Sequence, residues 1–155
     1  MYSSQEVSVI TEQFWTTFGM YLSPILSAEG EKINWVNYKT GEKDIRFIMI
    51  ADTQSAKISI TLLHKDVDLQ LLYFDKFVQI KKIFYQAVAE EWQWYPTIND
   101  KYGKIISEIF IIIDNVNILN KSDWPDIISF FKTRILLLDI FWCEYKYAFD
   151  RSFIQ

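Results

Sequence analysis

Cysteine and histidine are nearly absent from this sequence of 155 residues, which contains one of each, Cys143 and His64. A single cysteine cannot form an intramolecular disulfide, which is typical of proteins kept in a reducing compartment, so we expect a cytoplasmic protein. One histidine and one distant cysteine also lack the paired spacing of a zinc site. The sequence therefore predicts neither a metal ion nor a cofactor.

Glycine, proline and basic charge are also in short supply. Four glycines and three prolines allow few sharp turns and favour long helices and strands. A net charge of −4 excludes a basic field over the whole surface, although a local basic patch is compatible with the mixed charge along the chain. The first residues lack a basic stretch followed by an apolar run, and no apolar window is long enough to span a bilayer. We expect no signal peptide and no membrane partner.

Apolar residues, in contrast, make up half of the chain, and 17% of all residues are aromatic. A chain of this length and composition can bury one hydrophobic core of its own. No internal repeat, low-complexity tract or linker divides it. The sequence predicts a single domain covering residues 1–155.

Apolar residues recur along the chain in two patterns, one with helical spacing and one with strand spacing. Apolar residues three and four apart predict a helix from a capping position at Ser3 to about Leu22, another after Asp66, and a third after the sequence SDWP at residues 122–125. Alternating or isoleucine-rich runs predict strands at residues 33–38, 44–51, 57–63, 91–95 and 106–113. The predicted fold class is α+β: an antiparallel meander sheet of about five strands packed by three long helices, in the order α-βββ-α-ββ-α.

The stretch NYKTGEKDIRFIM, residues 37–49, gathers five charged side chains, a tyrosine and a glycine into thirteen positions. Lys39-Thr40-Gly41 has the form of a three-residue hairpin loop, with Gly41 at the left-handed position where a Cβ atom would clash. Charged residues beside such a turn are ordinarily solvated. The centre of this stretch is therefore explained by turn chemistry alone.

A second interpretation of this stretch depends on the register of the predicted sheet. If residues 52–56 form a five-residue loop, Asp44 pairs with His64, and Arg46 lies on the same face. A histidine beside a carboxylate could act as a general base or as a pH-sensitive pair. A register shifted by one residue would place these side chains on opposite faces. The alternative is that His64 only ends the strand or caps the next helix.

The order α-βββ-α-β is also that of restriction-endonuclease-like enzymes, an analogy at the level of fold. Such enzymes need an acid on the second strand and an acid-x-lysine pair on the third to hold a metal ion. Asp52 could supply the first acid, but Ser55-Ala56-Lys57 has a serine where the second is required. Glu144-Tyr145-Lys146 matches the pair literally but lies in the last predicted helix. The candidate catalytic residues on these two hypotheses are Asp44, Arg46, Asp52, Lys57 and His64.

Aromatic side chains near the predicted strands form a third group of candidates. Bases of single-stranded nucleic acids stack on such rings where basic groups neutralise the phosphates. The alternative is that these aromatics fill the core and a subunit interface. The candidate binding residues are Trp35, Tyr38, Lys39, Trp92 and Trp94.

Several separated segments resemble one small bacterial family, domain of unknown function 4268. They are INWVNYKTGEKDIRF, AKISITLLHKDVDLQLLYF, EEWQW and DWPDIISFFKTRILLLDIFWCEYKYAF, in that order. The resemblance extends from the first predicted helix to the last. It implies a cytoplasmic bacterial α+β domain, and members of the family also occur behind nuclease-like regions of longer proteins. It carries over no catalytic or binding residues.

The last predicted helix is apolar on nearly every side between residues 130 and 142, so we expect a homodimer through apolar helix faces. Because catalytic motifs are lacking, the sequence favours a non-catalytic binding or interaction protein over an enzyme. The resemblance suggests that it works alongside DNA-processing or defence proteins. The alternative is a divergent or degenerate restriction-endonuclease-like nuclease, and nucleic acid is a candidate partner on either reading.

Overall fold

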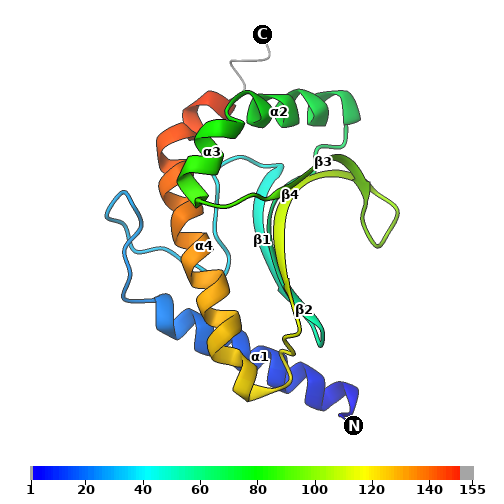
Figure 1. Cartoon of the computed structure of the whole chain (residues 1–155), viewed down its shortest axis with the longest axis vertical. Coiled ribbons are helices and arrows are strands. Elements are labelled where there is room, and N and C mark those ends of the chain that lie inside the picture. Colours follow the sequence, from blue (N-terminus) through cyan, green and yellow to red (C-terminus); the bar gives the residue numbers. More distant parts are fainter. Residues whose placement is uncertain (1, 151–155) are drawn as a thin grey trace.

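The computed structural model describes residues 2–150 and has an α+β fold, as predicted (Figure 1). Within these residues, one four-stranded antiparallel sheet and four α-helices replace the five strands and three long helices that were expected. The elements in chain order are α1 (Ser4–Leu22), β1 (Ile45–Ala51), β2 (Ser55–Leu62), α2 (Val67–Gln79), α3 (Lys81–Val88), β3 (Gln93–Asn99), β4 (Ile105–Asp114) and α4 (Trp124–Tyr145). Short 3-10 helices at Lys121–Asp123 and Lys146–Phe149 flank α4. In the part of the chain described, no helix combines the length and apolar character needed to cross a membrane.

The helix starts predicted from capping residues are confirmed. The Ser3 hydroxyl accepts the backbone N–H of Glu6, and the Glu6 carboxylate accepts the backbone N–H of Ser3, which completes a capping box at α1. Asp66 caps α2 by accepting the backbone N–H groups of Asp68 and Leu69. These bonds satisfy donors that the first turn of a helix leaves unpaired.

The sheet has the strand order β1-β2-β4-β3, so β1 and β3 are its edges. Figure 1 shows that the sheet is strongly curved, with α4 on its outer side, α2 across one end and α1 across the other. Ile58, Ile60 and Leu62 of β2 have no exposed surface. At the α1 end, Phe14 packs edge-on to Phe131 of α4 at 6.5 Å between ring centroids. Burying each large apolar side chain contributes about 1.5–3 kcal/mol, so this layer between sheet and helices is the core.

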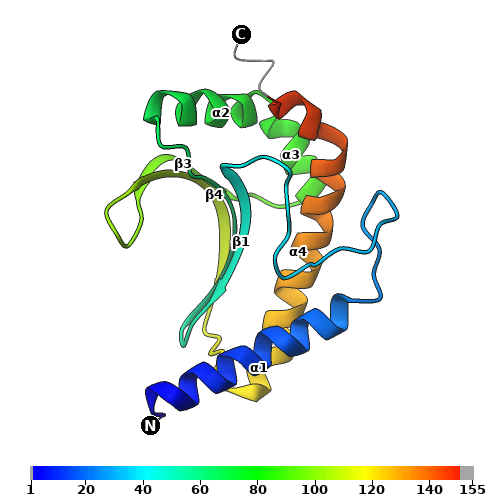
Figure 2. The same ribbon diagram turned by 180° about the vertical axis from the view of Figure 1, so that it is seen from behind.

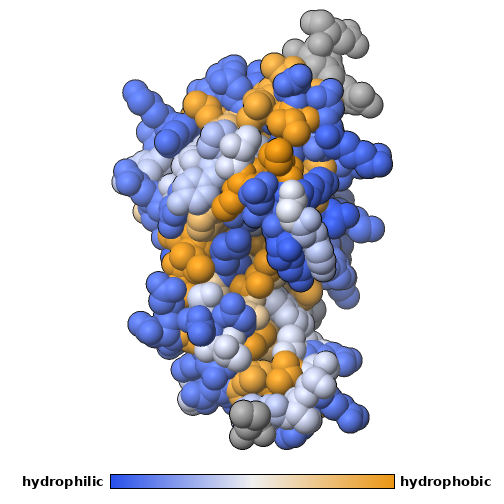
Figure 3. All heavy atoms as spheres, turned by 90° about the vertical axis from the view of Figure 1, so that its right-hand side faces the viewer, coloured by the Kyte–Doolittle hydropathy of each residue, from blue (hydrophilic) through white to orange (hydrophobic). Residues whose placement is uncertain are grey.

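We call the other, concave face of the sheet the hollow face; no helix within residues 2–150 covers it (Figure 1). One row of paired residues across this face contains Ile48, Ser59 and Phe110. Next to that row, the Lys57 amine lies 3.1 Å from both carboxylate oxygens of Glu108. Figure 3 shows apolar patches on this side separated by hydrophilic side chains.

The strand predicted at residues 33–38 is wrong, because this region belongs to an irregular connecting segment, residues 25–44, between α1 and β1. The Asn34 side chain accepts the backbone N–H groups of Val36 and Asn37, which forms a turn that competes with strand pairing. Gly41 has the left-handed φ of +85° that was expected. It lies in a turn leading into β1 and not in a hairpin between two strands.

The predicted register between β1 and β2 is wrong by one residue. Ala51 pairs with Ala56, and Asp44 lies opposite Leu63, whose backbone N–H donates to the Asp44 carbonyl at 2.8 Å. The cause is a tighter turn between β1 and β2, in which the Asp52 carboxylate accepts the backbone N–H groups of Gln54 and Ser55. Asp44 and His64 therefore do not form a cross-strand pair.

The single long helix predicted after Asp66 is two helices, α2 and α3, which meet at Ile80. No glycine or proline marks this break in the sequence. The change of direction brings Phe84 of α3 against Trp92, Trp94 and Phe141 at ring-centroid distances of 5.2, 5.6 and 5.2 Å. Tertiary packing therefore overrides the continuous helical pattern.

The strand predicted at residues 91–95 begins at Gln93 and continues past Pro96 to Asn99. Pairing between β3 and β4 is interrupted by a bulge between Tyr95 and Ile98. Because β3 is an edge strand, a proline without an N–H group can sit at this bulge without breaking a central ladder.

Candidate functional site

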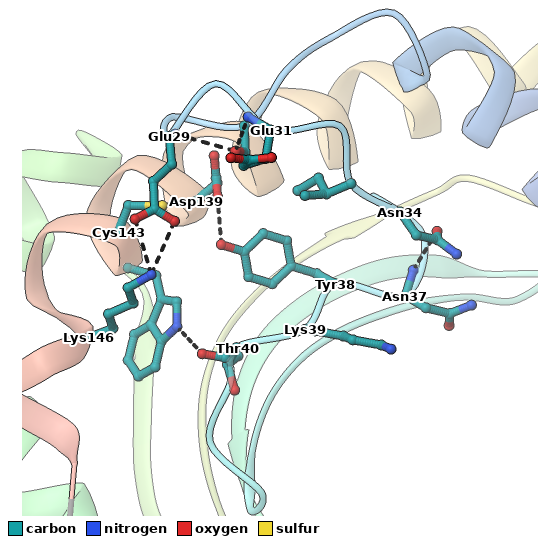
Figure 4. A pocket seen from close by; sticks show the side chains of 13 residues that line it. Glu29, Glu31, Asn34, Asn37, Tyr38, Lys39, Thr40, Asp139, Cys143 and Lys146 are labelled. Atoms are coloured by element: carbon teal, nitrogen blue, oxygen red, sulfur yellow. Dashed lines mark hydrogen bonds and ion pairs between the residues drawn. The ribbon is translucent and has the colours of Figure 1, made fainter.

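A pocket of about 510 Å³ lies between the connecting segment and the C-terminal half of α4 (Figure 4). Most of the residues that line it are polar, and the ring of Tyr38 and the indole of Trp142 supply aromatic surface. The residues contributed by the connecting segment are Ser27, Glu29, Glu31, Ile33, Asn34, Asn37, Tyr38, Lys39 and Thr40, and those contributed by the C-terminal region are Asp139, Trp142, Cys143 and Lys146.

Asp139 is the hydrogen-bonding centre of this pocket, and only 2% of its surface is exposed to solvent. Its Oδ1 atom accepts the Tyr38 hydroxyl at 2.5 Å, and its Oδ2 atom accepts the backbone N–H of Ala28 at 2.7 Å. The Cys143 thiol, one turn further along α4, lies 3.5 Å from Oδ1. Every one of these donors is neutral, and Asp139 forms no ion pair within residues 2–150. The pocket wall thus contains a buried carboxylate that is hydrogen-bonded but has no ion-pair partner within residues 2–150.

Three further contacts hold the connecting segment against α4 and the sheet. The Trp142 indole N–H donates to the Thr40 carbonyl at 2.7 Å, and the Thr40 hydroxyl donates to the Ile45 carbonyl at 2.6 Å. The Tyr38 ring stacks on Phe47 of β1 with 5.1 Å between centroids. Both hydrogen bonds are buried, and they hold the segment in place although it contains no helix or strand.

Charges at the mouth of the pocket do not cancel. The Lys146 amine forms an ion pair with Glu29 at 3.1 Å, as Figure 4 shows, while Glu31 and Lys39 have no ionic partner in the described part of the chain. The lining contains three carboxylates and two ammonium groups, counting Asp139, so its formal charge is −1.

Two groups that could act as nucleophiles are held in their protonated forms. Burial raises the pKa of the Tyr38 hydroxyl far above its ordinary value, and the hydrogen bond to Asp139 adds to the effect. Burial, together with the Asp139 charge, raises the pKa of the Cys143 thiol to about 11. A thiol with such a pKa contains little thiolate near neutrality, so it is a poor nucleophile. Neither Tyr38 nor Cys143 is therefore an activated nucleophile in this pocket.

The candidate catalytic residues on β2 and its turn have structural partners. Asp52 accepts the N–H groups of the turn between β1 and β2, and these bonds lower its pKa. Lys57 is paired with Glu108 on the hollow face. His64 lies beyond the other end of β2, an eight-residue strand about 26 Å long at the usual rise. The structure therefore separates Asp52 from His64 instead of joining them in one site.

His64 is 5% exposed, and its ring stacks on Tyr73 of α2 with 4.4 Å between centroids. Within residues 2–150, its Nδ1 atom has no hydrogen-bond partner. Burial lowers the pKa of His64, while the charge of Asp44 raises it in part. Arg46 is exposed on the hollow side of β1, and the structure does not bring it to His64.

The aromatic candidates are mostly part of the core. Trp35 and Trp92 are 2% and 6% exposed, and their indole N–H groups donate to the Ile25 carbonyl and the Glu90 carboxylate. Trp94 is half-buried against α3. Of the five residues proposed for binding, only Tyr38 and Lys39 line the candidate pocket.

Sequence reasoning missed Asp139, Cys143, Lys146 and Glu29 as a group. A signal existed in the run ILLLDIFWC, where Asp139 is the single charged residue in an otherwise apolar helical stretch. A carboxylate at such a position must be hydrogen-bonded or paired when the helix is buried. Its partners come from a segment about a hundred residues earlier, and no local pattern identifies them.

Comparison with protein families identifies the family of this chain. The family model described as Domain of unknown function (DUF4268) matches residues 10–146. The chain belongs to this family. The pocket between the connecting segment and α4 is called the α4 pocket below. All residues that line it fall within the stretch that matches DUF4268. No curated protein and no solved structure matches the chain. Among residues 2–150, no three His, Cys, Asp or Glu side chains gather closely enough to hold a metal ion.

Proposed function

We propose that this DUF4268 protein is a cytoplasmic, non-catalytic binding protein whose α4 pocket takes a small organic molecule with an ammonium group. The observation that carries the proposal is Asp139, a buried carboxylate in the pocket wall without a cationic partner within residues 2–150. An uncompensated buried charge is costly, and a ligand of opposite charge reduces that cost.

Two other features of the lining support an ammonium ligand. The rings of Tyr38 and Trp142 offer π-faces, to which cations are attracted by about 0.5–2 kcal/mol when partly desolvated. Glu31 at the mouth has no ionic partner in the described part of the chain and could steer a cation inward. Lys39 could in turn receive an acidic group, if the ligand carries one.

The proposal is tested by differential scanning fluorimetry with three ligands of one shape: n-butylammonium, n-butanol and n-butyrate. Only the ammonium compound should stabilise the protein. At a hundredfold excess over Kd, the stabilisation is about 2.7 kcal/mol, which raises Tm by about 5–10 °C for a domain of this size.

The test must distinguish the effect of the Asp139 charge from the general attraction of a cationic ligand to an acidic protein. Asp139→Asn keeps the shape and a hydrogen-bond acceptor but removes the charge, and it should abolish the stabilisation. Glu144→Gln, an exposed position on the same helix outside the pocket, is the matched control and should leave the shift unchanged. Equal stabilisation by all three ligands, or equal loss in both variants, would contradict the proposal.

We also propose self-association through α4, although most of its apolar residues are buried in the chain's own core. The remaining exposed stripe is short: Ile140 is 54% exposed, and Leu136 is half-buried one turn earlier. Sedimentation velocity of the wild type and of Ile140→Lys tests this, since a dimer through α4 should become a monomer in the variant. A role beside DNA-processing or defence proteins is supported only by the nuclease-like regions that precede this domain in longer members of the family.

A further inference from the structure

The free edge of the sheet at β1 has backbone groups available for pairing. Leu63 donates to the Asp44 carbonyl at one end of the β1–β2 ladder, and Asp52 donates to the Ser55 carbonyl at the other end. Hydrogen bonding alternates along an antiparallel strand, so the even-numbered residues of β1 bond to β2 and the odd-numbered ones point to the edge.

The backbone N–H and C=O groups that point outward from β1 differ in whether they have a hydrogen-bond partner. The Ile45 carbonyl accepts the Thr40 hydroxyl, so this position is already in use. The backbone groups of Phe47 and Met49, further along the edge, have no hydrogen-bond partner within residues 2–150. A row of unpaired N–H and C=O groups is a template for an additional strand.

A groove of about 730 Å³ runs beside these free groups. Residues 36–43 of the connecting segment form one wall, and residues 45–49 of β1 form the other. Figure 2 shows the connecting segment running alongside β1 before it turns into the strand. Val36, Ile48 and Met49 provide apolar surface in the groove, which is the type of surface that takes alternate side chains of an extended peptide.

The charge of this groove is positive, although the whole chain is acidic. Lys39, Lys43 and Arg46 line it and have no ionic partner in the part of the chain that the structure describes. Glu42 is the one carboxylate in the lining, so three cations and one anion give the lining a formal charge of +2. A second copy of this chain would bring the same three cations to the groove, so self-pairing is disfavoured by charge.

We propose that the β1 edge and this groove bind an extended segment of another protein, with acidic side chains facing Lys43 and Arg46. The segment adds a fifth strand beside β1 and pairs with the backbone groups of Phe47 and Met49. This inference does not depend on a ligand in the α4 pocket.

Fluorescence anisotropy with labelled peptides of about eight residues, enough to span β1, tests the proposal. The binding probe alternates valine and glutamate, and its charge-reversed partner alternates valine and lysine. A third peptide repeats the acidic sequence with N-methyl groups on alternate residues, which removes the donors needed for strand pairing. The acidic peptide should bind, and N-methylation should weaken it by about tenfold or more.

Two protein variants locate the site. Lys43→Glu combined with Arg46→Glu should weaken the acidic peptide by about tenfold or more. Lys82→Glu combined with Lys132→Glu, at exposed positions of α3 and α4 outside the groove, is the charge-matched control and should not. The proposal is overturned by equal binding of N-methylated and unmodified peptides, or by no binding at low salt. Stronger binding of a short DNA or RNA probe than of the peptide would also overturn it. The peptide series leaves the protein unchanged, so it decides the question even if a variant fails to fold.

Discussion

Tyr38 and Asp139 lie 101 positions apart in the sequence, and the tyrosine hydroxyl donates a hydrogen bond of 2.5 Å to the carboxylate. This bond joins the irregular connecting segment to the C-terminal half of α4. It also orients the carboxylate that we propose as the centre of the ligand pocket. The path of the connecting segment and the shape of the pocket therefore depend on the same pair.

Tyr38→Phe should lower the free energy of unfolding by about 1–3 kcal/mol, because it leaves a buried carboxylate short of one donor. Urea denaturation followed by circular dichroism measures this loss. The double variant with Asp139→Asn should show a smaller effect of the tyrosine change, since the charged acceptor has gone. Strictly additive effects of the two changes would show that the pair does not interact.

Cys143 should react slowly with iodoacetamide at pH 7. Because its thiol pKa is raised to about 11, the rate should rise about tenfold per pH unit through pH 10, with no plateau near the ordinary cysteine pKa of about 8.5. Asp139→Asn removes one cause of the raised pKa and should speed the reaction at pH 8. A plateau near pH 9 in protein that remains folded by circular dichroism would be inconsistent with the burial described.

Lys57→Met should destabilise the protein by roughly 2–4 kcal/mol, because the side chain of Glu108, which is 8% exposed, loses its charge partner. The double variant Lys57→Met/Glu108→Leu should recover most of that loss, since two apolar side chains then face each other. Lys146→Met breaks the more exposed pair with Glu29 and should cost only about 0–1 kcal/mol. Similar losses in both single variants would argue against a buried pair on the hollow face.

His64 should make the protein less stable in mild acid. Its pKa is lowered in the folded state by burial, so between that value and about 6.5 the unfolded chain binds more protons than the folded chain. The free energy of unfolding should then fall as the pH decreases through 6.5. His64→Phe keeps a ring against Tyr73 without titrating, and the wild type should lose stability relative to it from pH 7 to pH 5. A constant difference over this range would mean that His64 keeps its ordinary pKa.

The fold class and most elements could be predicted because hydrophobic period and capping residues are local signals. Ser3 and Asp66 cap helices as expected, and alternation identified β2. The predicted register failed because one carboxylate, Asp52, tightens a turn by one residue. The break at Ile80 has no local signal, since it follows from packing of Phe84 against distant aromatics.

The candidate site was harder to predict than the fold. Tyr38 and Lys39 were selected for the wrong reason, as part of a strand surface, and they line a pocket formed by an irregular segment. Asp139 stood out in its apolar helix, but its partners follow only from the tertiary path of the connecting segment. Pairing between residues a hundred positions apart lies outside any spacing rule.

An NMR titration tests the central claim most directly. Amide signals of ¹⁵N-labelled protein are followed while n-butylammonium is added, with n-butanol as the neutral control. We predict saturable shifts confined to residues 27–40 and 139–146, which disappear in Asp139→Asn and persist in Glu144→Gln. Shifts spread over carboxylates elsewhere on the surface, or unchanged shifts in Asp139→Asn, would contradict an ammonium-binding pocket on α4.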